Sequence, residues 1–104
     1  MIRHVVMMKL KDSADGPEVQ KRLEALPAAI AEIATYEVGL DELRGPRAWD
    51  VVLVSSFASV ADLERYIEHP VHQEVVAFLN EVCETRASVD FSADAPGLEA
   101  KVGV

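Results

Sequence analysis

The chain has one cysteine, Cys83, among its 104 residues, so no disulfide can form within a single copy. Cys83 lies near the end of an apolar pattern with helical spacing, which indicates a buried thiol. Its neighbours Val82 and Glu84 offer no cation that would favour a thiolate, and Arg86 lies past the predicted helix end. These features exclude a disulfide-stabilised fold, and we do not expect a reactive cysteine.

The chain also lacks an excess of positive charge. Ten Lys and Arg residues are outnumbered by eighteen Asp and Glu residues, which gives a formal net charge of −8. A phosphate backbone and an anionic membrane surface would both be repelled by this charge. We therefore expect neither nucleic-acid binding nor membrane binding.

Long apolar runs are absent as well, since no stretch approaches the roughly 18 residues that a membrane-spanning helix requires. The first eight residues are too short for a secretory signal, contain Arg3 and His4, and precede no small-residue cleavage site. We expect a cytoplasmic protein without a membrane span.

The residues that are present suffice for one hydrophobic core. Half of them are hydrophobic and 27% are charged, which is typical of a globular protein. A chain of this length buries roughly 65% of the surface that its unfolded form exposes. We expect one domain over residues 1–92, followed by a C-terminal tail over residues 93–104 that contains Pro96 and Gly97.

Hydrophobic periodicity predicts the secondary structure. Val19, Leu23, Leu26, Ile30 and Ile33 recur at steps of four and three, as on one side of a helix. Residues 2–10 and 34–40 alternate in the manner of strands. The first half of the chain should form a strand over 2–10, a helix from Pro17 that Pro27 kinks near residue 26, a strand over 34–40 and a turn over 41–47. The second half should form a strand over 48–57, a helix that begins at Ser59 and Asp62, a further helix after Pro70, and a strand over 85–91.

This βαββαβ order predicts an α+β, ferredoxin-like fold with a four-stranded antiparallel sheet and helices on one face. Val5, Met7, Val52 and Val54 would then form an apolar patch on the other face. Such a patch usually marks an interface, so we predict a homodimer in which two sheets pack face to face. Trp49, Tyr36 and Phe57 fall at strand periods, and we interpret them as core residues.

The stretch from Tyr66 to Glu74 joins the last two helices and contains two of the three histidines. Pro70 lacks a backbone donor and has a fixed φ, so it should end one helix and lie in the first turn of the next. This joint should bring Tyr66, His69 and His72 near one another.

Four segments of the chain resemble the stress-responsive dimeric α/β-barrel (Dabb) family, and the closing Val89-Asp90-Phe91 fits as well. They are Met1-Ile-Arg-His-Val-Val-Met-Met-Lys-Leu-Lys, Tyr36-Glu-Val-Gly, Trp49-Asp-Val-Val-Leu-Val and Tyr66-Ile-Glu-His-Pro-Val-His-Gln. The resemblance covers roughly residues 1–92 and implies a ferredoxin-like dimer whose two sheets close into a barrel. It also implies, from a polyketide cyclase branch of the family, that Tyr66 and His72 serve an aldol-type ring closure, with His4 matching the histidine of the first strand.

In such chemistry a base removes a proton beside a carbonyl, and a donor stabilises the resulting enolate. His72 would be the base and Tyr66 the donor, while His4 would line the same pocket. The alternative is that His72 and Tyr66 hold the helix joint together by hydrogen bonds and that His4 is a core histidine. The first functional hypothesis is accordingly a non-catalytic, stress-related homodimer that binds a small apolar ligand, and the second is a cyclase-like or lyase enzyme.

Metal and cofactor chemistry have little support in the sequence. His69 and His72 are three residues apart, and a third ligand would have to come from His4, Glu68 or Glu74 without any metal motif. A heme-degrading or quinone-forming monooxygenase would share the barrel architecture, but no motif here indicates one. We therefore predict no metal and no cofactor.

Overall fold

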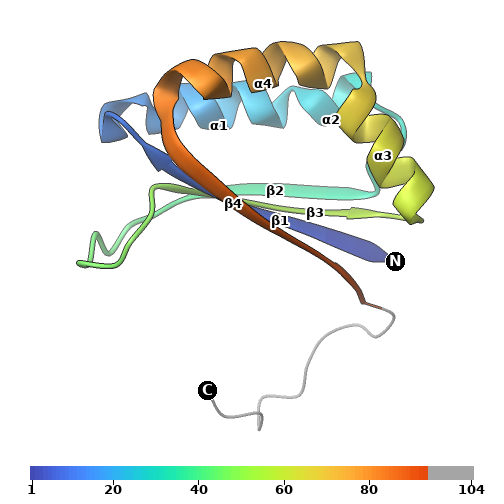
Figure 1. Cartoon of the computed structure of the whole chain (residues 1–104), viewed down its shortest axis with the longest axis horizontal. Coiled ribbons are helices and arrows are strands. Elements are labelled where there is room, and N and C mark those ends of the chain that lie inside the picture. The colour runs from blue at the N-terminus through green and yellow to red at the C-terminus, as the bar shows by residue number, and fades with distance from the viewer. Residues whose placement is uncertain (94–104) are drawn as a thin grey trace, which may run out of the picture.

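A computed structural model of the chain describes residues 1–93, in which one sheet is covered on one side by helices (Figure 1). All but the first residue of the tail expected over residues 93–104 lies outside the described part. The elements are β1 (Ile2–Leu10), a 3₁₀ turn (Ser13–Asp15), α1 (Gly16–Glu24), α2 (Leu26–Ala29), β2 (Thr35–Leu40), β3 (Val51–Phe57), α3 (Val60–Glu68), α4 (Pro70–Val82) and β4 (Cys83–Ser92).

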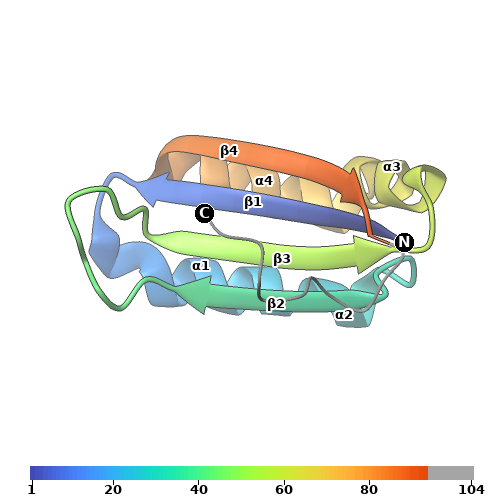
Figure 2. The same ribbon diagram turned by 90° about the horizontal axis from the view of Figure 1, so that it is seen from below.

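The sheet has four strands in the order β2-β3-β1-β4, and each pair of neighbours is antiparallel. Figure 2 shows this order from below, with the helices behind the strands. The register sets Val6 opposite Leu53 on β3 and His4 opposite Asp90 on β4. The predicted ferredoxin-like βαββαβ fold is confirmed.

Alternation along β1 decides which residues enter the core. His4, Met8 and Leu10 are buried on the side that faces the helices, whereas Met7 and Lys9 are exposed on the other side. The buried hydrophobic residues form one cluster between the sheet and the helices. Its members are Met8, Leu10, Val19, Leu23, Leu26, Ile30, Val38, Val51, Leu53, Phe57, Leu63, Tyr66, Leu79 and Cys83.

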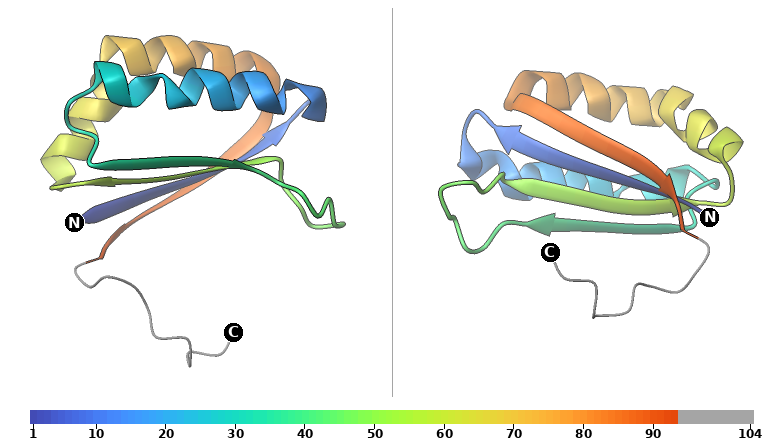
Figure 3. Two further views of the ribbon diagram at one scale, coloured as in Figure 1. Left: turned by 180° about the vertical axis from the view of Figure 1, so that it is seen from behind. Right: turned by 60° about the horizontal axis from the view of Figure 1, so that its bottom comes forward.

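The side of the sheet opposite the helices, here called the outer sheet face, is apolar as predicted. Residues opposite one another in an antiparallel pair share a face, so Ala87 and Val89 of β4 lie beside Met7 and Val5 of β1. Both views in Figure 3 show every helix on one side of the sheet. The large hydrophobic residues exposed on this face are Met7 (42%), Val54 (36%), Val89 (65%) and Phe91 (43%).

Several element boundaries differ from the predicted ones; β4, for example, runs from Cys83 to Ser92 rather than over 85–91. Pro27 divides the helix into α1 and α2 as expected, but the helix ends at Ala29, so Ile33 lies beyond it and is only partly buried. The third strand begins at Val51 rather than Ala48, which leaves Trp49 half-buried in the preceding loop instead of in the core.

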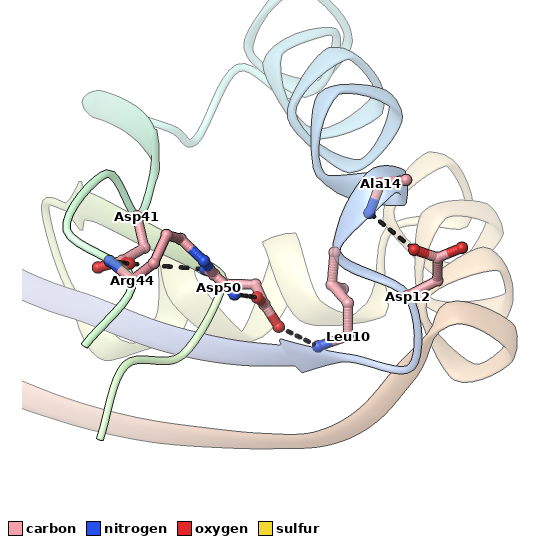
Figure 4. A network of polar contacts seen from close by, with 6 residues as sticks. All are labelled: Leu10, Asp12, Ala14, Asp41, Arg44 and Asp50. Carbon is pink, nitrogen blue, oxygen red and sulfur yellow. Dashed lines mark hydrogen bonds and ion pairs between the residues drawn. The ribbon is translucent and has the colours of Figure 1, made fainter. Parts of the chain in front are cut away.

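Just before the start of β3, the buried side chain of Asp50 makes contacts with the end of β1 and with the β2–β3 connection (Figure 4). Its Oδ2 accepts a hydrogen bond from the Leu10 backbone N–H at 2.7 Å, a donor that no strand carbonyl then takes. Its Oδ1 accepts from Arg44 Nη2 at 2.7 Å. These contacts fasten the β2–β3 connection to the end of β1, and in that connection Arg44 has a positive φ of 54°.

Candidate functional site

The joint between α3 and α4 is built as the sequence predicts. α3 ends at Glu68, and α4 begins with Pro70 in its first turn. His69 between them has extended backbone angles (φ −62°, ψ 133°), and its Nδ1 accepts a hydrogen bond from the Val71 N–H at 3.1 Å. His69 therefore caps α4, because it satisfies one of the backbone donors that a helix start leaves free.

His72 lies one turn into α4 and reaches back to α3. Its Nδ1 is 3.0 Å from the Ile67 carbonyl oxygen, which also accepts from Gln73 Nε2 at 2.6 Å. A carbonyl oxygen only accepts hydrogen bonds, so Nδ1 of His72 carries a proton. In the neutral ring, Nε2 of His72 is then the nitrogen with a free lone pair.

Tyr66 is fully buried beneath this joint. Its ring centroid lies 4.3 Å from that of His72 and 6.1 Å from that of His4. Its hydroxyl is 2.8 Å from the hydroxyl of Tyr36 on β2. The structure thus brings together all three residues singled out from the sequence, Tyr66, His72 and His4.

His4 is held from the neighbouring strand. Its Nδ1 lies 2.5 Å from Oδ1 of Asp90, the residue opposite it in the β1–β4 register. Asp90 is an acceptor here when ionised, so Nδ1 of His4 donates and the second ring nitrogen is available for another contact. The His4 side chain is 11% exposed, whereas that of Asp90 is 43% exposed.

A cavity of about 210 Å³ lies between the sheet and helices α3 and α4, and His4, Tyr66 and His72 all line it. For comparison, an engineered cavity of roughly 150 Å³ is large enough to hold benzene. The remaining lining residues are mostly apolar: Val6, Met8, Leu23, Leu53, Ile67, Val76, Leu79, Arg86, Ala87 and Ser88.

Both principal side chains of this cavity are neutral at pH 7. Burial lowers the pKa of His72 below its ordinary value, the bond to the Ile67 carbonyl opposes this shift, and His4 and His69 lower the pKa further. Burial raises the pKa of Tyr66, although its hydrogen bond to Tyr36 acts in the other direction. An imidazole that can accept a proton therefore lies beside a phenol that retains its own.

Comparison with known proteins identifies the family of this chain. Residues 2–93 match the family model of the stress responsive A/B barrel domain, Dabb. The chain belongs to the Dabb family. The resemblance noted over residues 1–92 is therefore confirmed.

Individual relatives support this assignment. An uncharacterized protein of Streptomyces coelicolor is 36% identical over 86 residues, covering 78% of this Dabb chain and 89% of the relative. A stress-response A/B barrel domain-containing protein of Arabidopsis thaliana is 32% identical over 100 residues, which cover 90% of this chain and 37% of that protein. Among solved structures, a dimeric protein of unknown function with a ferredoxin-like fold from Bacteroides fragilis has a TM-score of 0.80 at 33% identity, covering 88% of this chain and 95% of the other.

Sequence reasoning missed two partners of the site in this Dabb domain, Tyr36 and Asp90. Tyr36 was expected only as a core residue, and Asp90 only as part of a matching segment. A signal for Asp90 was present in β4, where polar Arg86, Ser88 and Asp90 alternate with more apolar neighbours. That alternation marks a strand whose polar side faces the cavity.

Three other features of the described part of this Dabb chain concern metal binding, membrane-spanning helices and the exposure of its cysteine. Over residues 1–93, no three His, Cys, Asp or Glu side chains are grouped so that they could hold a metal ion. None of the helices in the same range is long and apolar enough to cross a membrane. Cys83 is buried, as its position in the apolar pattern indicates.

Proposed function

We propose that the chain forms a homodimer through its outer sheet face. The support is the apolar surface that each copy leaves uncovered, where Val89 is 65% exposed and Phe91 43% exposed. Contiguous apolar surface of this kind is normally buried against a partner. A two-fold axis would set the same patch on both copies and bury it on each. The relative from Bacteroides fragilis is itself described as dimeric.

We further propose that each protomer binds a small, largely apolar molecule between its sheet and helices. The cavity carries this proposal, because it combines apolar walls with three convergent polar side chains, His4, Tyr66 and His72. Binding sites for small molecules commonly have this composition, in which the polar groups fix the ligand's orientation.

A second candidate function is an aldol-type ring closure, favoured by the His72 ring, whose Nε2 is free and whose centroid lies 4.3 Å from that of the Tyr66 ring. Nε2 would remove a proton from the carbon next to a carbonyl, and the Tyr66 O–H would stabilise the enolate oxygen. The enolate carbon would attack a second carbonyl of the same molecule and form a carbon–carbon bond. The resulting alkoxide would take the proton back from the imidazolium of His72. In this arrangement Tyr36 donates to the Tyr66 oxygen, which frees the Tyr66 proton for the substrate.

Ligand binding is tested by a thermal-shift screen of small carbonyl compounds on the wild type, His72→Ala and His69→Ala. A ligand at a hundredfold excess over its dissociation constant stabilises the folded state by about 2.7 kcal/mol. We expect compounds that raise the melting temperature of the wild type to do so equally for His69→Ala, because His69 caps α4 without lining the cavity. They should act at least tenfold more weakly on His72→Ala.

A blocked variant completes this design. Val76→Phe places a larger side chain at the cavity wall and should abolish the shift for every compound. Equal stabilisation of all four proteins would place the binding elsewhere and would contradict the proposal.

A further inference from the structure

Arg86 of β4 is the cation that lines the cavity. It lies opposite Met8 on the helix-facing side of the sheet, and Ser88 follows two residues later on the same side. Its Nη2 donates to Oδ1 of Asn80 at 2.5 Å. Within residues 1–93 its guanidinium pairs with no carboxylate, in contrast to Arg22 and Arg65, which pair with acidic side chains on their own helices.

A guanidinium group has five N–H donors in a planar fork that matches a carboxylate. Asn80 uses one of these donors, so the others are available to a ligand. Ser88 can add a hydroxyl donor from the same strand. The walls behind these two residues are apolar, and His72 is neutral at pH 7. Arg86 and Ser88 are therefore the polar residues that β4 contributes to the wall of the cavity, and Arg86 also lies beside Asn80 at its edge.

We propose that the ligand of this cavity is a small carboxylic acid, whose carboxylate binds Arg86 and Ser88 and whose apolar body points toward Tyr66 and His72. This inference rests on the proposed ligand binding and specifies its chemical class. The volume of about 210 Å³ limits the body to one ring or a short acyl chain.

The surroundings favour a single negative charge over a phosphate dianion. Asp90 lies two residues beyond Ser88 on the same side of β4, and its carboxylate is bound to His4. The whole chain has a net charge of −8, which opposes the entry of a doubly charged group. One guanidinium fork satisfies a carboxylate, whereas a phosphate needs additional donors.

Matched pairs of acids and amides test this inference on the full chain. Calorimetric titrations at pH 7.5 would compare benzoate with benzamide and hexanoate with hexanamide, since each pair differs mainly in charge. We expect the wild type to bind each acid at least tenfold more tightly than its amide. Arg86→Met should weaken acid binding at least tenfold and leave amide binding within twofold, and Arg86→Lys should retain part of the preference.

Arg47→Met is the matched control, because it removes the same charge from a loop residue that does not line the cavity. We expect it to leave the preference for acids unchanged. Equal binding of acids and amides by the wild type, or full acid affinity in Arg86→Met, would overturn the inference. If the preference for acids is absent but the wild type binds the amides and Val76→Phe does not, the cavity still binds a ligand, and only the inference about its chemical class fails. If neither acids nor amides bind and the thermal-shift screen finds no compound, both proposals fail together.

Discussion

Two tyrosine hydroxyls meet at 2.8 Å in the interior, where Tyr36 of β2 reaches Tyr66 of α3. Burial raises the pKa of Tyr36, and the proximity of Tyr66 raises it further. Both phenols therefore remain protonated, and one of them donates to the other. Removing either hydroxyl leaves the other without this partner in a buried setting, which is the costly case for a polar group.

Replacing Tyr36 and Tyr66 by Phe, singly and together, should reveal this coupling. We expect each single variant to lower the free energy of unfolding by about 1 to 2 kcal/mol. The double variant should lose about 1 kcal/mol less than the sum of the two, because the second substitution removes a group that has already lost its partner. Urea denaturation measures all four proteins, and additivity within about 0.3 kcal/mol would argue against the bond.

His72 can have a structural role in the helix joint and a chemical role in the cavity at the same time. The hypothesis of a structural joint and the hypothesis of a chemical site concern different nitrogens of the same ring. Nδ1 ties α4 to the Ile67 carbonyl, while the ring as a whole lines the cavity. A histidine has two distinct ring nitrogens, so its bond through one sets the protonation of the other.

At the scale of elements, Asp50 lies just before the start of β3 and connects two other segments to it. Its carboxylate binds Leu10 at the end of β1 and Arg44 in the β2–β3 connection. Its hydrogen bond from the Leu10 N–H lowers its pKa below the ordinary value of 3.8, burial opposes this shift, and Arg44 lowers it further. A folded-state pKa below the unfolded one means that the stabilising contribution is present above pH 3.8. It is lost as the pH falls through the folded-state value.

Asp50→Ala should lower the free energy of unfolding by about 2 to 3 kcal/mol at pH 7, because it leaves the Leu10 N–H without its acceptor. Asp12→Ala is the matched control, since Asp12 accepts one backbone N–H at an exposed turn and should cost about 1 kcal/mol or less. The difference between Asp50→Ala and the wild type should shrink when denaturation is repeated near pH 3. A difference that stays constant with pH would be inconsistent with an ionised Asp50.

Local pattern was sufficient for most elements but not for the contacts between them. Alternation over residues 2–10 gave β1 with its observed bounds, and Pro70 gave the joint, because both depend on near neighbours in the chain. The contacts His4–Asp90 and Tyr36–Tyr66 connect residues 86 and 30 positions apart. Such pairs depend on the register of the sheet and on helix packing, which no local spacing encodes.

The misplacement of Trp49 has the same origin. Residues 48–57 alternate as a continuous strand would, so the sequence pattern has no visible break before Val51. The backbone of Asp50 still donates to the Met8 carbonyl at 2.9 Å, but the next donor of β1, the Leu10 N–H, binds the Asp50 carboxylate, 40 positions away in the sequence. The alternation is a local property, whereas the end of the β1–β3 ladder is a tertiary one.

For the whole molecule, the proposed homodimer depends on the outer sheet face. Val89→Glu would set a charge within the proposed interface, where burying an unpaired carboxylate is strongly unfavourable. We expect the wild type to sediment as a dimer at micromolar concentration and Val89→Glu to sediment as a monomer. Val60→Glu is the control, because Val60 is 54% exposed on α3, on the other side of the sheet. A monomeric wild type, or two variants that behave alike, would contradict an interface on this face.

The state of His72 is central to the chemistry of the cavity, since the proposed ring closure needs a neutral ring with a free Nε2 as its base. The most direct measurement is a nitrogen-15 NMR spectrum of the imidazole rings at pH 7.5, with His72→Gln used to assign the signals. We predict that His72 carries its proton on Nδ1, that Nε2 is unprotonated and shifts when a cavity ligand is added, and that the ring titrates below pH 6.5. A proton on Nε2 with a bare Nδ1, or a pKa above 6.5, would contradict the account.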